Sequence, residues 1–328
     1  METLWMCPAC GGTNAHYSQR LTALDAASNF VRPWADEKRH GELVKCIAGL
    51  WGSDEARLVG CGDCGLRSAD PFVGGDANFY ALAYGRQSLH PYPGWRWEYG
   101  LTQAVITSTT GTVLEIGAGD GAFQRKIIAE GVEPSRLHAT EFNDGARQAL
   151  RALGVSVGAA DFRDSPPATH SVVCGHQVFE HLGDLNQAFE AFERITAPDG
   201  VVAVSVPNGA HSLRQEAAGG QIDMPPNHVS TWNVRAFRAL AERHGWQVSD
   251  YREEPISRLR SAKLLAMSRA FRARTRRASL PALAERWAPS PRARYMLMGV
   301  SAASKFPLAY WASAVPCGGS VWVAMKRA

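Results

Sequence analysis

The chain has 328 residues, of which 45% are hydrophobic and 20% are charged, and its formal net charge is +4. These values favour a globular core over intrinsic disorder, and the mild charge does not by itself indicate a nucleic-acid-binding protein. A run of about 18 uncharged apolar residues, which a membrane-spanning helix needs, does not occur, and no apolar leader follows Met1. We therefore expect a soluble cytoplasmic protein.

Two matching cysteine pairs mark the first 70 residues. They are Cys7-Pro8-Ala9-Cys10-Gly11 and Cys61-Gly62-Asp63-Cys64-Gly65. The odd total of seven cysteines argues against a disulfide framework, whereas four thiolates from two such turns suit the tetrahedral geometry of zinc. We predict a zinc-ribbon-like module over residues 1–70, with residues 11–60 folding as an insertion. Its structural zinc would be held by Cys7, Cys10, Cys61 and Cys64.

Residues 71–110 follow as an aromatic linker and a leading helix. The linker contains Tyr80, Tyr84, Tyr92, Trp95 and Trp97. Flat aromatic faces suit a sugar or another ring, although such side chains as often pack between modules.

An alternation of strands and helices begins at residue 111 and predicts a mostly parallel sheet covered by helices. The predicted strands are 112–116, 137–141, 155–159, 171–175, 201–206, 246–251 and 320–326, and the predicted helices are 122–130, 144–153, 186–195 and 233–244. Pro198-Asp199-Gly200 is expected to form a turn. The pattern predicts an α/β, Rossmann-like domain over residues 111–328.

A glycine turn joins the first strand of this domain to its first helix. It is Gly117-Ala118-Gly119-Asp120-Gly121, and glycines there let a ligand approach the main chain closely. Glu141 ends the second strand, where a carboxylate can accept hydrogen bonds from both hydroxyls of a ribose. The turn also fits the dinucleotide pattern G-x-G-x-x-G/A. Glu115, before the first glycine, and Asp161-Phe162, after the third strand, favour a methyl donor over a dinucleotide.

These motifs, together with the segment from Val178 to Asp184 (VFEHLGD), resemble class I S-adenosylmethionine-dependent methyltransferases. The similarity is strongest to the branch of ubiquinone-type O-methyltransferases and polysaccharide-pathway methyltransferases, and it covers about residues 111–254 and 318–328. It implies a seven-stranded sheet and a bound S-adenosylmethionine. The cofactor-binding residues that it implies are Glu115, Gly117, Ala118, Gly119, Asp120, Gly121, Glu141, Phe142, Asp161, Phe162 and Gln177.

Four histidines, His176, His181, His211 and His228, lie near the carboxyl ends of the fourth and fifth strands. An imidazole can accept a proton near neutral pH, so each is a candidate base if the acceptor must be deprotonated. We select His228 and His181 as the catalytic candidates. A role in packing, or a reaction without a base, stays open.

Residues 256–315 form a predicted helical insertion before the last strand. Arginines are interleaved there with Leu259, Leu264, Leu265, Met267 and Phe271. The pattern fits an amphipathic helix in peripheral contact with a membrane, a lid that binds a phosphorylated acceptor, or a solvated basic surface.

The leading hypothesis is a methyltransferase that acts on a small-molecule or saccharide acceptor, with O-methylation expected. One alternative is a nicotinamide-dependent oxidoreductase. Another is a zinc-ribbon scaffold or binding protein with a non-catalytic methyltransferase domain. Nucleic acid is not an expected partner, because the cysteine-rich module lacks a dense basic and aromatic surface. The pattern leaves the acceptor and the oligomeric state open.

Overall fold

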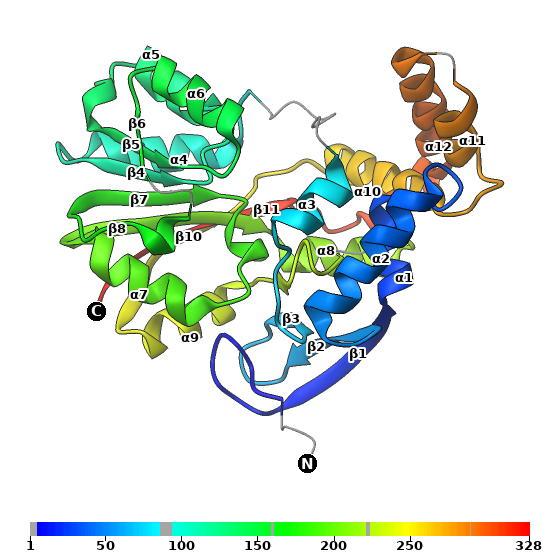
Figure 1. The fold of residues 1–328 in the computed structure, drawn as a ribbon, viewed down its shortest axis with the longest axis horizontal. Helices are drawn as coiled ribbons and strands as arrows, with labels where there is room; N and C mark the ends of the chain where they lie inside the picture. The colour runs from blue at the N-terminus through cyan, green and yellow to red at the C-terminus, as the bar shows by residue number, and fades with distance from the viewer. Residues whose placement is uncertain (1–4, 86–93, 159–160, 221–223, 289) are drawn as a thin grey trace.

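The centre of the protein is a seven-stranded sheet (Figure 1). The computed structural model describes residues 5–85, 94–158, 161–220, 224–288 and 290–328. The strands, in their order across the sheet, are β10 (Trp246–Glu253), β11 (Ser320–Arg327), β8 (Thr196–Pro207), β7 (His170–His176), β4 (Val113–Ile116), β5 (Leu137–Thr140) and β6 (Ser156–Val157). Neighbouring strands from β8 to β6 pair in parallel, and β11 is antiparallel to both of its neighbours. The predicted mixed α/β fold with a mostly parallel sheet is confirmed.

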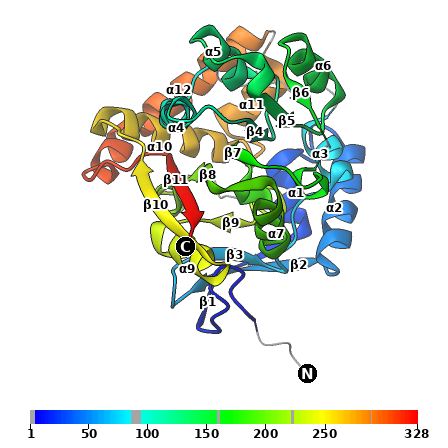
Figure 2. The same cartoon turned by 90° about the vertical axis from the view of Figure 1, so that its left-hand side faces the viewer.

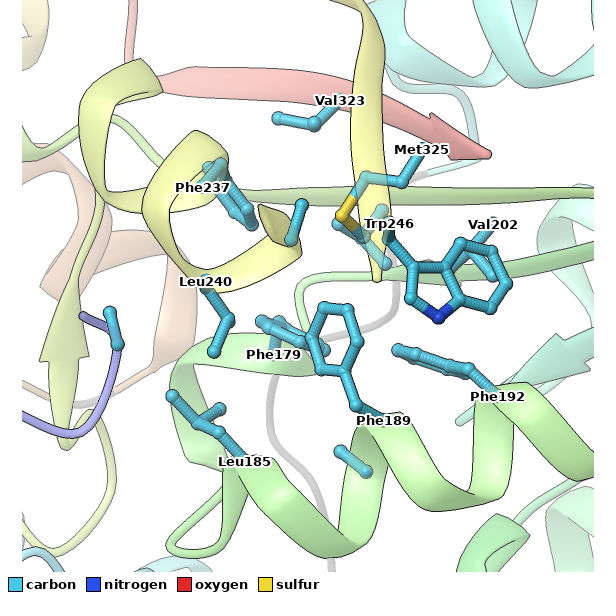
Figure 3. Close-up of a cluster of buried hydrophobic side chains, with 14 of the residues drawn as sticks. Phe179, Leu185, Phe189, Phe192, Val202, Phe237, Leu240, Trp246, Val323 and Met325 are labelled. Atoms are coloured by element: carbon cyan, nitrogen blue, oxygen red, sulfur yellow. The ribbon is translucent and has the colours of Figure 1, made fainter. Parts of the chain in front are cut away.

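Helices cover both faces of this sheet, as expected when parallel strands are buried on both sides (Figure 1). On one face lie α4 (Trp97–Thr107), α5 (Ala122–Ala129) and α6 (Asp144–Ala152), which share a core with β4, β5 and β7. On the other lie α7 (Leu185–Ile195) and α9 (Val234–Arg243). Figure 3 shows this second core, in which Phe189 and Phe192 pack near Trp246 and Phe237 packs near Phe179. The two cores hold the carboxyl ends of the strands in place.

Side-chain caps explain where several of these helices begin. The carboxamide oxygens of Asn143 and Asn233 accept hydrogen bonds from the first turns of α6 and α9, and the Asp184 carboxylate does the same for α7. Helix α5 differs, because it begins at Gly121 without a side-chain cap. Its first backbone N–H groups therefore have no capping side chain, a feature that suits a ligand.

The predicted elements are present with small shifts of their ends. One correction concerns Pro198-Asp199-Gly200, because β8 includes these residues. The β7–β8 pairing jumps from Thr196 to Val201, so the expected turn is a bulge within one strand. A second concerns 71–100, which is not only a connection but contains α3 (Ala77–Tyr84) and the start of α4. Tyr92 and the last residue of the predicted strand 155–159 lie outside the described residues.

The N-terminal module has its own antiparallel sheet, ordered β1 (Ala15–Thr22), β2 (Glu55–Cys61), β3 (Arg67–Asp70) and β9 (Ser230–Thr231). The last strand comes from the second half of the chain. Between β1 and β2 the chain forms α1 (Ala23–Phe30) and α2 (Glu37–Trp51), which pack against α3. In Figure 2 this small sheet lies below the seven-stranded sheet.

Residues 256–315 form three helices between β10 and β11: α10 (Arg258–Ala273), α11 (Leu280–Trp287) and α12 (Pro291–Ala312). They have a small core of their own, which includes Leu265, Met298 and Ala302. In Figure 1, α11 and α12 extend away from the seven-stranded sheet. Among the described helices, none is long and apolar enough to span a bilayer. Helix α8 (Gly209–Ala217) packs against α10.

Candidate active site and cysteine cluster

The glycine turn follows β4 and bends the chain into α5. Gly117, Gly119 and Gly121 have φ values of +64°, +55° and +81°, a region that L side chains rarely adopt. The Gly119 N–H donates a 2.8 Å hydrogen bond to Glu141 Oε2, and the Asn143 N–H donates one of 2.8 Å to Oε1. The glycine turn and the acid after β5 therefore meet. Ala118 and Asp120 complete the turn, and the Asp120 carboxylate pairs with Arg125.

Glu115 lies in β4 below this turn and is almost fully buried. Its Oε1 is 3.3 Å from His176 Nδ1, and the other ring nitrogen of His176 is 3.0 Å from Thr102 Oγ1. Burial raises the pKa of Glu115, and the hydrogen bond with His176 opposes that rise. Trp322 Nε1 donates to Thr102 Oγ1 at 2.9 Å, which extends the chain of contacts to β11. The buried histidine thus fixes the orientation of the acid.

Gln177 occupies a strained backbone position at the end of β7. Its φ is +58°, and no other described non-glycine residue has a positive φ. A 2.8 Å hydrogen bond from its N–H to the Ser205 carbonyl holds this conformation. The side-chain Nε2 is buried and has no hydrogen-bond partner among the described residues. An orphaned donor beside the glycine-bearing strand end indicates that a ligand group belongs there.

The acid and ring after β6 differ in exposure. Phe162 is buried in the core and stacks on Phe192, with ring centroids 5.6 Å apart. Burial of Asp161 favours its neutral form, but hydrogen bonds from Arg163 outweigh this effect and lower its pKa. Phe142, next to Glu141, is 72% exposed. The exposed aromatic ring next to Glu141 therefore belongs to Phe142, while Phe162 is packed in the core.

A second group of side chains centres on His181, in the single-turn helix Phe179–His181. His181 and His228 lie with ring centroids 4.8 Å apart, and Glu180 Oε1 is 3.9 Å from His181 Nε2. The Asn227 carbonyl, 2.6 Å from His181 Nδ1, can only accept, so Nδ1 carries a proton. The Tyr80 hydroxyl lies 3.2 Å from the same Nδ1. The structure thus brings the two catalytic candidates together, and with Glu180 they could also hold a metal ion.

The four predicted metal ligands also meet. Cys7 Sγ is 3.6 Å from Cys64 Sγ, and Cys10 Sγ is 3.5 Å from Cys61 Sγ. All four sulfurs lie within 4.8 Å of one another. Four thiolates about 2.3 Å from a zinc ion have tetrahedral edges of roughly 3.8 Å, close to these separations. The Cys64 thiol lowers the pKa of Cys7 to about 5, although burial opposes this.

The two cysteine turns have the same backbone design. Gly11 N–H donates to the Cys7 carbonyl and Gly65 N–H to the Cys61 carbonyl, each at 2.9 Å. These glycines have φ of +74° and +75°. The arrangement fits a closed tetrahedral metal site.

Several residues of these two groups of side chains could not be identified from the sequence around them. Thr102 and Tyr80 reach the sites from helices that precede the sheet. His176 was one of four histidines near strand ends, but its partner, Glu115, lies 61 residues earlier. His211 bonds to the Cys317 carbonyl at 3.0 Å.

Comparison with known proteins gives a family for the central part of the chain. Residues 98–251 match the family model of a methyltransferase domain. A search of curated protein sequences gave no match. One similar solved structure is an S-adenosylmethionine-dependent methyltransferase from Mesorhizobium loti, at 13% identity over 70% of this chain and 97% of that chain, with a TM-score of 0.42. Another is coclaurine N-methyltransferase bound to N-methylheliamine and SAH, at 12% identity over 70% of each chain, with a TM-score of 0.42.

The matched residues include the glycine turn, Glu141 and the strand ends that carry His176 and Gln177. They therefore form a methyltransferase domain, and the protein is an enzyme of the methyltransferase class.

Proposed function

We propose that this enzyme transfers the methyl group of S-adenosylmethionine to an oxygen atom of a small-molecule or saccharide acceptor. The observation that carries the proposal is the junction of the glycine turn and Glu141. Three glycines in the left-handed region bend the chain from β4 into α5, and the Glu141 carboxylate accepts a hydrogen bond from Gly119 N–H. A nucleoside whose tail ends in a carboxylate, as the methionine part of S-adenosylmethionine does, suits such a pocket.

The donor would be bound in three parts. Glu141 would accept hydrogen bonds from the ribose hydroxyls, and Phe142 and Asp161 would contact the adenine, with Phe162 behind them. Glu115 and the turn Gly117-Ala118-Gly119-Asp120-Gly121 would shape the methionine end. The buried Nε2 of Gln177, which lacks a partner among the described residues, would face the donor beside its sulfonium.

The residues on the acceptor side would orient the acceptor and remove its proton. The sulfonium supplies a methyl carbon that is already activated, so alignment of acceptor, carbon and sulfur is the main requirement. In the neutral form of His181, Nε2 carries the lone pair, because Nδ1 donates to the Asn227 carbonyl. His181 or the adjacent His228 would therefore accept the hydroxyl proton, with Glu180 stabilising the imidazolium.

We also propose that Cys7, Cys10, Cys61 and Cys64 hold one structural zinc ion within a module over residues 1–70. The support is the fit of the sulfur separations to a thiolate tetrahedron. Residues 71–110 would link this module to the methyltransferase domain over residues 111–328. The roof of the acceptor pocket would come from 225–232, from part of 256–315 and from 79–99, of which residues 86–93 lie outside the described part of the chain. Trp97 takes little part in such a roof, since its indole N–H bonds to Ser320 Oγ at 2.6 Å.

Calorimetry with S-adenosylhomocysteine tests the donor site. We expect a dissociation constant in the micromolar range, about −8 kcal/mol. Glu141→Ala should weaken binding by roughly 1–3 kcal/mol through loss of charge-assisted hydrogen bonds. Glu141→Gln separates loss of charge from loss of shape, and Glu133→Ala, an exposed acid before β5, is the control. Binding of NADH instead would support the oxidoreductase alternative. Binding of neither ligand would support a non-catalytic scaffold.

Transfer of a labelled methyl group tests the base. With saccharide, nucleotide-sugar and quinone-precursor acceptors as probes, His181→Ala or His228→Ala should lower kcat by roughly a hundredfold or more. The affinity for S-adenosylhomocysteine should not change, because neither imidazole is assigned to the donor. Equal kcat values for wild type and both variants, once an acceptor is found, would mean that the reaction needs no base from this pair.

A further inference from the structure

Residues 256–315 hold a strong excess of positive charge. This stretch contains twelve Lys and Arg residues and a single acid, Glu285. The rest of the chain has 23 basic and 30 acidic residues, so it is net negative. The mild net charge of the whole chain is therefore the sum of a strongly basic insertion and a net acidic remainder. Exposed arginines within it are Arg260, Arg272, Arg276, Arg277, Arg286 and Arg292.

The same insertion exposes an unusual amount of apolar surface. Of the seventeen large apolar side chains that are exposed among the described residues, ten lie here. On α12, Met296 is 73% exposed and Trp311 is 80% exposed, with Val300 and Leu308 between them. At roughly 100° per residue these four side chains fall within an arc of about 120°, and they span roughly 22 Å of helix.

The other face of α12 is apolar as well, and it is already occupied. Met298, Ala302 and Ala309 are buried against α10 in the core of the insertion. A surface helix of a water-soluble protein normally carries polar residues opposite its buried face. The exposed stripe of Met296, Val300, Leu308 and Trp311 therefore occupies the face of α12 where polar residues are expected. This stripe lies within a segment rich in exposed arginines.

We infer that the stripe of α12 and the arginines of the insertion form a surface that docks on an anionic lipid bilayer. Arginines attract anionic headgroups, and Trp, Leu and Met side chains enter the boundary between headgroups and acyl chains. A second copy of the chain is a poor partner, because it would bring one strongly positive insertion against another. A nucleic acid would satisfy the arginines but not the aliphatic stripe. This inference does not depend on the proposed reaction.

Co-sedimentation of the full-length protein with vesicles tests the inference. The probes are vesicles of phosphatidylcholine mixed with phosphatidylglycerol, and vesicles of phosphatidylcholine alone. We expect binding to the anionic vesicles that weakens as salt rises. Replacing Arg272, Arg276 and Arg277 by Gln should reduce the partition coefficient roughly a hundredfold, at about 1 kcal/mol per arginine. The matched control replaces three exposed bases elsewhere, Lys38, Arg151 and Arg238, by Gln.

A second pair of variants tests the apolar stripe. Met296→Ser with Trp311→Ser should reduce vesicle binding roughly tenfold or more, since the inserted apolar area is lost. The control pair, Tyr17→Ser with Leu24→Ser, removes exposed apolar side chains outside the insertion and should leave vesicle binding unchanged. Circular dichroism and melting temperatures check that the variants fold. The inference is overturned if the wild type ignores anionic vesicles, if the controls lose as much binding, if only RNA is bound, or if Trp311→Ser dissociates a dimer without affecting vesicle binding.

Discussion

Two segments are added to the seven-stranded sheet, and the structure joins them to it in different ways. The cysteine turns of the N-terminal module are part of the main core, since Cys7, Cys61 and Leu66 pack in one cluster with Phe179 and Trp232. Strand β3 pairs with β9, and Arg67 makes a bidentate ion pair with Glu216 of α8, at 2.7 and 3.1 Å. This module is built into the fold.

The insertion over residues 256–315 has a small core of its own, and its other contacts are with α8 and with the N-terminal module, where Glu285 lies 3.9 Å from Arg32. Its helices bury apolar side chains chiefly against one another. The strands on either side of it are paired, with Glu253 opposite Val321 in the β10–β11 ladder. An added segment whose side chains pack in the main core therefore contributes to the stability of the enzyme. An addition at the end of a hairpin can present its own surface without changing the sheet.

Removal of the metal site should have the largest effect. Cys61→Ser should abolish the one zinc ion per chain that we expect in wild type. Zinc binding contributes on the order of 10 kcal/mol in small zinc domains, comparable with the whole stability of a domain. Because the cysteine turns share the main core, we expect affinity for S-adenosylhomocysteine to fall too. Metal analysis and calorimetry measure this. Cys46→Ser, a half-buried thiol outside the cluster, is the control.

Two outcomes would contradict this part of the comparison. Unfolding of residues 5–70 with unchanged donor affinity would make the module an independent domain. A second metal ion that survives in Cys61→Ser would point to Glu180, His181 and His228, the other described group with suitable ligands.

The ion pair between Arg67 and Glu216 should have the next largest effect. Both side chains are largely buried, so Glu216→Ala leaves an uncompensated charge and should lower the free energy of unfolding by about 3 kcal/mol. Arg67→Met combined with Glu216→Leu should recover most of that loss, because both charges are removed together. Urea denaturation measures the free energy of unfolding of both variants. Glu242→Ala, at an exposed position of α9, is the control. A loss below about 1 kcal/mol would mean that the pair adds little to the junction.

Removal of the insertion should have the smallest effect on the catalytic domain. A short Gly/Ser turn in place of residues 257–314 can close the β10–β11 hairpin, because the Glu254 N–H donates to the Ser320 carbonyl at 3.0 Å. We expect donor affinity to stay within about twofold, since the insertion contributes no residue to the glycine turn. Vesicle binding should disappear. A large loss of donor affinity would show that the insertion supports the donor site.

Much of the fold could be predicted from local patterns. The strand–turn–helix at Gly117-Ala118-Gly119-Asp120-Gly121 has a backbone that requires glycine, and the buried strands are continuous apolar runs. The bulge at 198–200 was missed because Pro-Asp-Gly favours a turn, while pairing to β7 continues on both sides. Helix α3 was missed because a short aromatic segment has no clear helical period.

The sequence by itself determined the succession of the seven strands of the large sheet along the chain, the glycine turn with its strand-end acid, and the four cysteines. All of these depend on short-range periodicity or on the backbone demands of single residues. Only the tertiary structure decided that Glu115 meets His176 and that Glu180, His181 and His228 converge, with Tyr80 in contact with His181. It also decided that the cysteine turns enter the main core and that α12 leaves an apolar stripe exposed. Those features depend on which distant surfaces pack together, and that choice is made by the burial of the whole chain rather than by any one segment.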